Sequence, residues 1–250
     1  LVANLDAGKI EKLKDVAGVR RVEAPQEFHI NLETARGRAT RLDEALKLPG
    51  AATGKGVVVG IIDTGVDWTH QDFVDDAGDS RLELFIHARR LPDSLESETK
   101  EFDRDKLNAA LKALGAGKKA DVPPGDANGH GTHCASIAAG NGRASKGRFR
   151  GVAPDASLVG VRSEPLLDAH IIEGMRRIFQ QANGRPAVVN LSLGGHLGAH
   201  DGTAAIEQAI ASETGPGRIV VVAAGNEGED QIHWSGGLTR GQDLIIPFRV

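Results

Sequence analysis

Residues 57–63, VVVGIID, are apolar without interruption up to a terminal aspartate. A short apolar run of this kind is typical of a strand buried on both faces of a parallel sheet. Helical apolar stripes over residues 168–182 and 203–212 alternate with similar runs further along the chain. This alternation predicts an α/β fold built on a doubly wound, mostly parallel sheet. The further strand candidates are residues 156–162 (ASLVGVR), 187–193 (AVVNLSL) and 218–224 (RIVVVAA).

Changes in composition divide the chain into three parts. Residues 1–30 have the pattern of a small β-α-β piece, and residues 31–55 are polar with scattered Gly and Arg, as in a linker or an exposed arm. Residues 56–250 carry the strand and helix alternation. Within them, residues 74–127 are rich in charge and contain a Pro-Pro-Gly, which predicts a surface insertion with one helix over residues 103–115.

Composition excludes several classes of function. The 250 residues are 40% hydrophobic and 26% charged, as in an ordinary globular protein. A formal net charge of −4 gives no electrostatic footprint for a nucleic acid, and no apolar run approaches the length that spans a bilayer. Cys134 is the single cysteine, so an intrachain disulfide framework and a thiolate zinc cluster are both excluded.

Polar residues follow three of the predicted strands, where ligands gather in open parallel sheets. Asp63 closes the first strand, Ser192 lies at the end of the third, and Asn226 follows the fourth. His130 opens a predicted helix in the stretch NGHGTH. Each residue alone has a structural interpretation, such as a turn for Asp63, or a tight turn with a left-handed residue for Asn226 with Gly225 and Gly228. Their occurrence together, after consecutive strands, favours a catalytic site.

Five stretches resemble, in order, the signature blocks of subtilisin-like serine peptidases. They are VVVGIIDTGVDWTHQDF (57–73), NGHGTHCASIAAG (128–140), GVAPDASLVGVR (151–162), VVNLSLGG (188–195) and VVVAAGNEG (220–228). The resemblance implies a subtilisin-like fold and a serine endopeptidase that acts on protein or peptide substrates. It also implies secretion or attachment to the cell envelope.

Roles follow from this resemblance by position in each block. Asp63 corresponds to the triad aspartate, His130 to the triad base and Asn226 to the oxyanion-hole amide. Ser192, Leu193 and Gly194 correspond to the segment that binds the substrate backbone. The chemistry agrees, because a hydroxyl nucleophile needs a base, the base needs an orienting carboxylate, and the oxyanion needs a preorganised donor.

The N-terminal part adds a partner to this expectation. Residues 12–25, KLKDVAGVRRVEAP, resemble the end of the inhibitor-like propeptide that precedes the catalytic domain in this family. The resemblance implies that residues 1–30 are a propeptide-like segment that blocks the substrate cleft until it is processed, at a point within residues 30–45.

The nucleophilic serine of the family is missing from the sequence. Both Gly-Thr pairs of the chain are followed by another residue, His133 or Ala204, and Ser192 belongs to the substrate-binding block. The preferred explanation is that the chain is an incomplete N-terminal portion with the serine beyond Val250, and is itself inactive. The alternative is a catalytically inactive pseudopeptidase that acts as a binding or scaffold protein.

No metal or other cofactor is expected. Asp72 matches a position that ligates calcium in many relatives, but residues 141–150, NGRASKGRFR, are basic where an oxygen-rich ligand loop would be needed. A His₂-carboxylate metal site from His130, His133 and Asp63 is the rival interpretation, and no zincin motif supports it.

Overall fold

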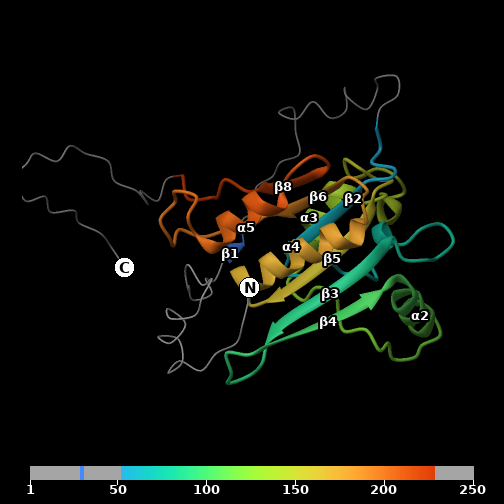
Figure 1. The fold of residues 1–250 in the computed structure, drawn as a ribbon. Helices are drawn as coiled ribbons and strands as arrows, with labels where there is room; N and C mark the ends of the chain where they lie inside the picture. Colours follow the sequence, from blue (N-terminus) through green and yellow to red (C-terminus); the bar gives the residue numbers. More distant parts are fainter. Residues whose placement is uncertain (1–28, 31–51, 229–250) are drawn as a thin grey trace, which may run out of the picture.

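The computed structural model describes residues 29–30 and 52–228 of the chain (Figure 1). Six strands form one sheet in the order β4-β3-β5-β2-β6-β8, and β1 pairs with β7 in a separate two-stranded sheet. In the six-stranded sheet every pair is parallel except β3 with β4. The strands are β1 His29–Ile30, β2 Val58–Asp63, β3 Leu82–Arg90, β4 Ser97–Asp103, β5 Ser157–Glu164, β6 Ala187–Leu191, β7 Leu193–Gly194 and β8 Arg218–Val222.

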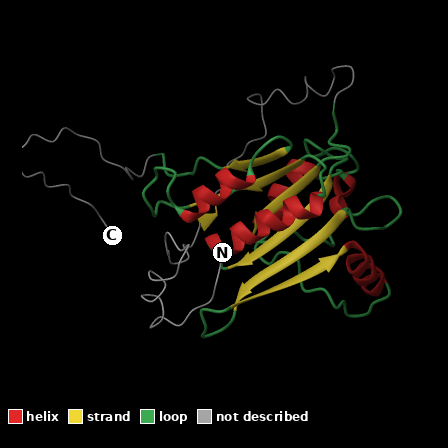
Figure 2. Ribbon diagram, in the orientation of Figure 1, coloured by secondary structure: helices red, strands yellow, loops and turns green. Residues whose placement is uncertain are grey.

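Helices cover both faces of the large sheet (Figure 2). One apolar core lies between the sheet and helices α4 and α5, and a second lies on the opposite face under α3 and α2. This arrangement confirms the predicted doubly wound α/β fold. The α-helices are α2 Arg104–Gly115, α3 His130–Ala139, α4 Asp168–Ala182 and α5 Ala205–Glu213, and the 3₁₀-helices are η2 Gln71–Phe73 and η3 Arg143–Ser145.

Strand β2 contributes to both cores, as its unbroken apolar sequence predicts. Val58 and Ile62 point into the core under α4, while Val59 and Ile61 point into the core under α3. Ile61 and Ile62 are fully buried, and each such side chain stabilises the fold by about 1.5–3 kcal/mol. Gly60 lets α4 approach closely, because a Cβ there would lie 2.5 Å from Ile178 Cδ1.

The region of residues 74–127 differs from the expected surface insertion. The expected helix is present as α2, but β3 is a core strand that pairs with β5 in parallel. Leu84, Phe85 and Ile86 of β3 are buried. Strand β4 pairs with β3 in antiparallel register and forms the edge of the sheet opposite β8, and α2 follows it (Figure 1).

Strand β8 also differs from its expected burial on both faces. It pairs with β6 alone among the described strands and forms one edge of the sheet. Ile219, Val221 and Val222 are each about half exposed. The apolar run therefore predicts a parallel strand correctly here. It does not predict how far the faces of that strand are buried.

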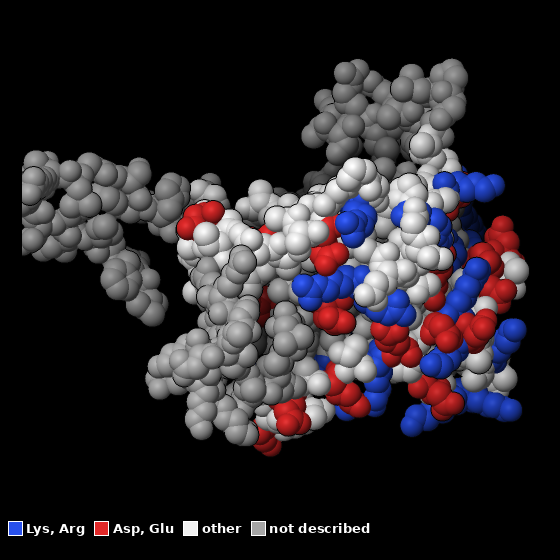
Figure 3. Space-filling model, in the orientation of Figure 1, with Lys and Arg blue, Asp and Glu red and all other residues white. Residues whose placement is uncertain are grey.

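The surface shows no field of one sign on the face seen in Figure 3, where acidic and basic side chains lie interspersed. Ion pairs at the surface include Arg89 with Glu98 and Arg177 with Glu101. Within the described ranges, no helix combines the length and the hydropathy required to cross a bilayer.

Candidate active site

Asp63 is the last residue of β2, and its register partner in the neighbouring strand β5 is Arg162, two residues before β5 ends at Glu164. Its side chain is completely buried. The backbone N–H of Thr64 donates a 2.7 Å hydrogen bond to Asp63 Oδ1, so the turn that follows the strand fixes the carboxylate. A buried, oriented carboxylate therefore stands where the open sheet gathers functional groups.

His130 is the first residue of α3, the helix that packs against β2. Gly129 precedes it in a left-handed conformation, with φ of 93°, and Asn128 Oδ1 accepts a hydrogen bond from the His130 N–H. Gly129 is suited to this position because a residue with a Cβ is strained there. The turn brings the imidazole over the carboxyl end of β2.

Asp63 and His130 form a buried hydrogen-bonded pair. His130 Nδ1 lies 2.7 Å from Asp63 Oδ1, and His130 is 8% exposed. A carboxylate only accepts, so this bond places the hydrogen of the neutral ring on Nδ1 and leaves Nε2 as an acceptor. Nε2 of His130 has no hydrogen-bond partner within the described residues, nor has Asp63 Oδ2. The pair thus holds a base whose accepting nitrogen is free.

Burial and hydrogen bonding act in opposite directions on the Asp63 carboxyl. Burial raises the pKa of Asp63 above its ordinary value, while hydrogen bonds from His130 and from the Thr64 backbone act in the opposite direction. A carboxylate that burial deprives of water is stabilised by a positive charge beside it. A positive charge on the His130 ring, whose Nδ1 lies 2.7 Å from Asp63 Oδ1, would supply that stabilisation.

Cys134 lies one turn along α3, beneath the pair. Its sulfur is 3.9 Å from His130 Nδ1, and one ligand atom each from Asp63, His130 and Cys134 lie within 4.8 Å of one another. Burial raises the pKa of the Cys134 thiol to about 11. Since the thiolate is the form that attacks electrophiles, the neutral thiol argues against a role for Cys134 as a nucleophile.

His133 does not join this group. Its side chain is exposed, and its backbone N–H donates to the Gly129 carbonyl within the helix. The rival site of two histidines and a carboxylate is therefore not assembled, and the two histidines of the motif have separate environments.

The expected substrate-binding segment follows β6. Ser192 Oγ accepts a hydrogen bond from Asn190 Nδ2 at 2.9 Å. Leu193 and Gly194 form β7, which pairs with β1 in antiparallel register, Ile30 opposite Leu193 and His29 opposite Gly194. The backbone of this segment thus binds an extended stretch of chain that lies more than 160 positions earlier in the sequence.

Asn226 is not brought to the pair by any hydrogen bond among the described residues. It lies in the loop after β8 and is exposed, and its backbone N–H donates to Glu227 Oε2. The preceding Gly225 is left-handed, with φ of 99°, as the predicted turn requires.

The residues around Asp72 do not fit a calcium ion. Asp72 Oδ1 accepts from the Ala144 N–H and Oδ2 accepts from Ser136 Oγ, while Arg81 Nη1 donates to the Asp72 carbonyl. Calcium needs six to eight oxygen ligands, about 2.3–2.6 Å away, that are free to coordinate it. Here N–H and O–H donors occupy those oxygens, and Arg143 places a further cation at the neighbouring carbonyl of Asp75.

Known proteins resemble this chain in sequence over most of its length. Residues 54–242 match the model of the subtilase family. Serine protease AprX of Bacillus subtilis (strain 168) is 30% identical over 230 residues, which cover 87% of this chain and 43% of that protein. The extracellular serine proteinase of Thermus sp. (strain Rt41A) is 30% identical over 245 residues, which cover 91% of this chain and 47% of that protein.

A solved structure is similar as well. The CspB protease of Clostridium perfringens matches with a TM-score of 0.65 at 32% identity, over 77% of this chain and 40% of that one. The chain spans less than half the length of each of these three relatives. The family match extends over the whole described sheet from β2 to β8 and over the buried pair of Asp63 and His130, and the chain therefore belongs to the subtilase family.

Proposed function

We propose that the protein to which this chain belongs is a serine endopeptidase whose nucleophilic serine lies C-terminal to Val250. The observation that carries the proposal is the buried 2.7 Å hydrogen bond between Asp63 and His130, which leaves His130 Nε2 as a free acceptor. A hydroxyl becomes a nucleophile when such a nitrogen accepts its proton. The chain without that serine would not hydrolyse peptides.

The proposed reaction follows the triad chemistry. The serine hydroxyl attacks the scissile carbonyl carbon while its proton passes to His130 Nε2, and Asp63 stabilises the resulting imidazolium. His130 then donates this proton to the leaving amine, which breaks the peptide bond and gives an acyl-enzyme. Water hydrolyses the acyl-enzyme with His130 again as the base. In this scheme the Asn226 side chain donates to the oxyanion of each tetrahedral intermediate.

Substrate binding in this proposal uses the segment of Ser192, Leu193 and Gly194. The pairing of β7 with β1 supports it, because the same backbone groups that hold His29 and Ile30 suit an extended peptide. We also propose that the segment over residues 1–30 acts as a propeptide whose end occupies the substrate position. Its residues 1–28 and the processing region within residues 31–45 lie outside the described residues.

We also propose that the protein is secreted or attached to the cell envelope. One of the relatives above is named an extracellular proteinase, and this name supports secretion or attachment to the cell envelope. No part of the proposal involves a nucleic acid or a membrane.

The test is hydrolysis of a chromogenic peptide by the full-length protein after removal of residues 1–30. A serine-directed phosphonylating agent is expected to abolish hydrolysis and to label one serine C-terminal to Val250, as peptide mapping would show. Inhibition by a chelator without phosphonylation would support the metal hydrolase instead. A folded, processed protein that is neither active nor labelled would support the pseudopeptidase.

We further propose that calcium does not stabilise this fold through Asp72. The midpoint of thermal unfolding of the full-length protein in excess EDTA is expected to match the midpoint in excess CaCl₂. A site saturated at 100 times its Kd would add about 2.7 kcal/mol, which raises the unfolding midpoint of a domain of about 150–250 residues by roughly 5–10 °C and that of a longer protein by less. A shift of that size in Asp72-containing protein that disappears in Asp72→Ala would contradict the proposal.

A further inference from the structure

The carboxylate of Asp126 lies at the junction of the two segments that carry the buried pair. It is partly buried in the loop before α3 and accepts hydrogen bonds from both sides. Oδ1 accepts from Thr64 Oγ1 at 2.9 Å and from the backbone N–H groups of Asn128 and Gly129. Oδ2 accepts from the N–H of Thr132 at 2.9 Å and from its Oγ1 at 2.7 Å. All five bonds end on one side chain.

The two threonines form reciprocal links between the segments. Thr64, in the turn after β2, accepts a hydrogen bond at Oγ1 from the Gly131 N–H of α3. Thr132, in α3, accepts at Oγ1 from the Asp67 N–H of the β2 loop. Each hydroxyl has one hydrogen, and each gives it to Asp126. Each therefore presents a lone pair to the backbone N–H of the opposite segment.

The charge state of Asp126 fixes the direction of these hydrogen bonds. Burial raises the pKa of Asp126, but hydrogen bonds from Thr132, from the Gly129 and Thr132 backbone and from Thr64 outweigh it, so the pKa lies below its ordinary value. As a carboxylate, Asp126 has no hydrogen to give and only accepts. Both hydroxyls must then point their hydrogens toward it, which fixes the direction of both links.

We infer that Asp126 is a positioning residue for the catalytic pair, since its carboxylate orients the two threonine hydroxyls that join the Asp63 loop to the helix of His130. Asp63 is the neighbour of Thr64 and also accepts the Thr64 N–H, so the same turn carries the link and the catalytic carboxylate. His130 lies between Gly129, which donates to Asp126, and Gly131, which donates to Thr64. This inference rests on the proposed peptidase function.

The first test replaces one carboxylate oxygen by a donor. In Asp126→Asn the amide group retains a single accepting oxygen, so either the donors at Oδ1 or those at Oδ2 face an NH₂ group. We expect kcat for a short chromogenic peptide to fall by about 10- to 100-fold, as misplacement of reacting groups does, with KM changed by less than about threefold because the variant alters orientation rather than uniform binding.

Thr64 and Thr132 separate the two links. Thr64→Val and Thr132→Val each remove one hydroxyl at nearly constant volume, and each is expected to lower kcat. Thr64→Ser and Thr132→Ser keep the hydroxyl and are expected to restore most of the kcat. This pattern of loss and rescue remains measurable if Asp126→Asn fails to fold.

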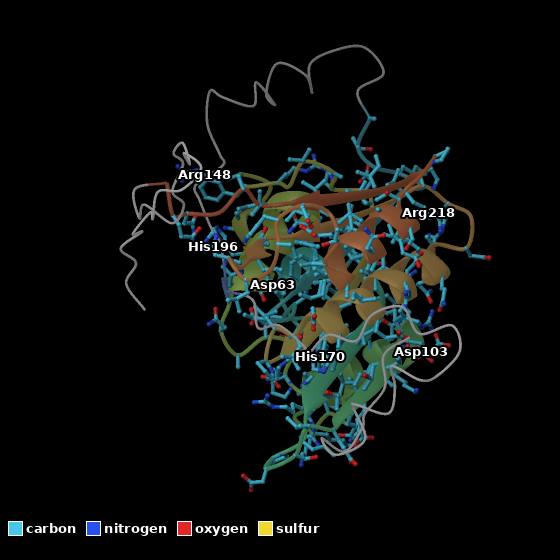
Figure 4. All side chains as sticks on the ribbon, turned by 60° about the vertical axis from the view of Figure 1, so that its left-hand side comes forward. Asp63, Asp103, Arg148, His170, His196 and Arg218 are labelled. Atoms are coloured by element: carbon cyan, nitrogen blue, oxygen red, sulfur yellow. The ribbon has the colours of Figure 1, made fainter. Side chains whose placement is uncertain are left out.

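Asp103→Asn is the matched control. Asp103 Oδ1 accepts from the Lys106 N–H at the start of α2, so it is also an aspartate at a helix N-terminus. It lies away from Asp63 across the molecule (Figure 4). Asp103→Asn is expected to leave kcat unchanged, which separates loss of a helix cap from loss of positioning.

An NMR measurement tests the position of His130 without relying on catalytic activity. The Nδ1 proton of His130, assigned by its absence in His130→Ala, is expected to shift or broaden in the NMR spectrum of Asp126→Asn and not in that of Asp103→Asn. A folded Asp126→Asn protein with unchanged kcat and an unchanged proton signal would overturn the inference. A wild-type protein without activity would overturn the proposed function instead, and the proton signal would still decide the positioning role.

Discussion

His130→Ala in the full-length, processed protein is expected to lower kcat/KM for peptide hydrolysis by at least about 100-fold, the lower bound of what a positioned general base contributes. The geometry gives the reason. His130 is buried and bonded to Asp63 through Nδ1, so its Nε2 is the accepting nitrogen that the proposed mechanism uses. Among the described residues, the neighbouring Cys134 cannot replace it as a base, because its thiol keeps its proton up to a pKa of about 11.

His133→Ala is the matched control, because it removes the same side chain from the same helix. His133 is exposed, and surface substitutions change free energies by about 0.5 kcal/mol or less. Activity should therefore stay within about threefold of wild type. Steady-state kinetics of both variants, with circular dichroism to verify folding, would check the pair. Equal losses in both would refute the assignment of the base.

The sequence predicts the elements of the core well because burial on both faces leaves a plain signal. The run that ends at Asp63 and the helical stripe over residues 168–182 correspond to β2 and α4, and Asn183 caps the end of α4 in the left-handed conformation. The motifs also predict that Asp63 and His130 lie together, since the end of a parallel strand and the start of the helix meet at one edge.

Two features of the fold were not readable from local patterns. The apolar stretch of β3, Leu84 to Ile86, is only three residues long and is flanked by charged residues. The local sequence pattern of the region therefore predicts a surface insertion. Strand β8 has a strongly apolar sequence, yet the described part of the chain leaves it half exposed. Long-range pairing and the coverage of a sheet face depend on distant residues, which a local window does not contain.

Contacts between residues distant in the sequence also determine part of the candidate site. Asp126 lies two positions before the NGHGTH motif and carries no signal of its own, because an aspartate before Asn-Gly is common in turns. Its importance comes from contacts with Thr64, 62 positions away in the sequence. The exposed loop position of Asn226 likewise does not follow from its motif.

Gly131 makes the close approach of the pair possible. It follows His130 in the first turn of α3, where the helix crosses the turn after β2. A Cβ at this position would lie 2.0 Å from the Gly65 carbonyl oxygen and 2.8 Å from Asp63 Cβ. The first of these atoms belongs to the backbone, so it cannot rotate away as a flexible side chain would. A larger residue must therefore move α3 away from β2, and His130 moves with it.

Gly131→Ala is accordingly expected to cost at least about 1–3 kcal/mol of unfolding free energy, as overpacking does, and to lower kcat about 100-fold, the effect of moving a reacting group by about 1 Å. Gly115→Ala is the matched control, since Gly115 also lies in a helix but has open space where its Cβ would stand. That change should be neutral, or should stabilise by up to about 1 kcal/mol through helix propensity. Urea unfolding and single-turnover kinetics of both variants would check this expectation. Wild-type kcat in Gly131→Ala would mean that the helix can shift without moving His130, and the spacing of α3 from β2 would then not be what sets the geometry of the pair.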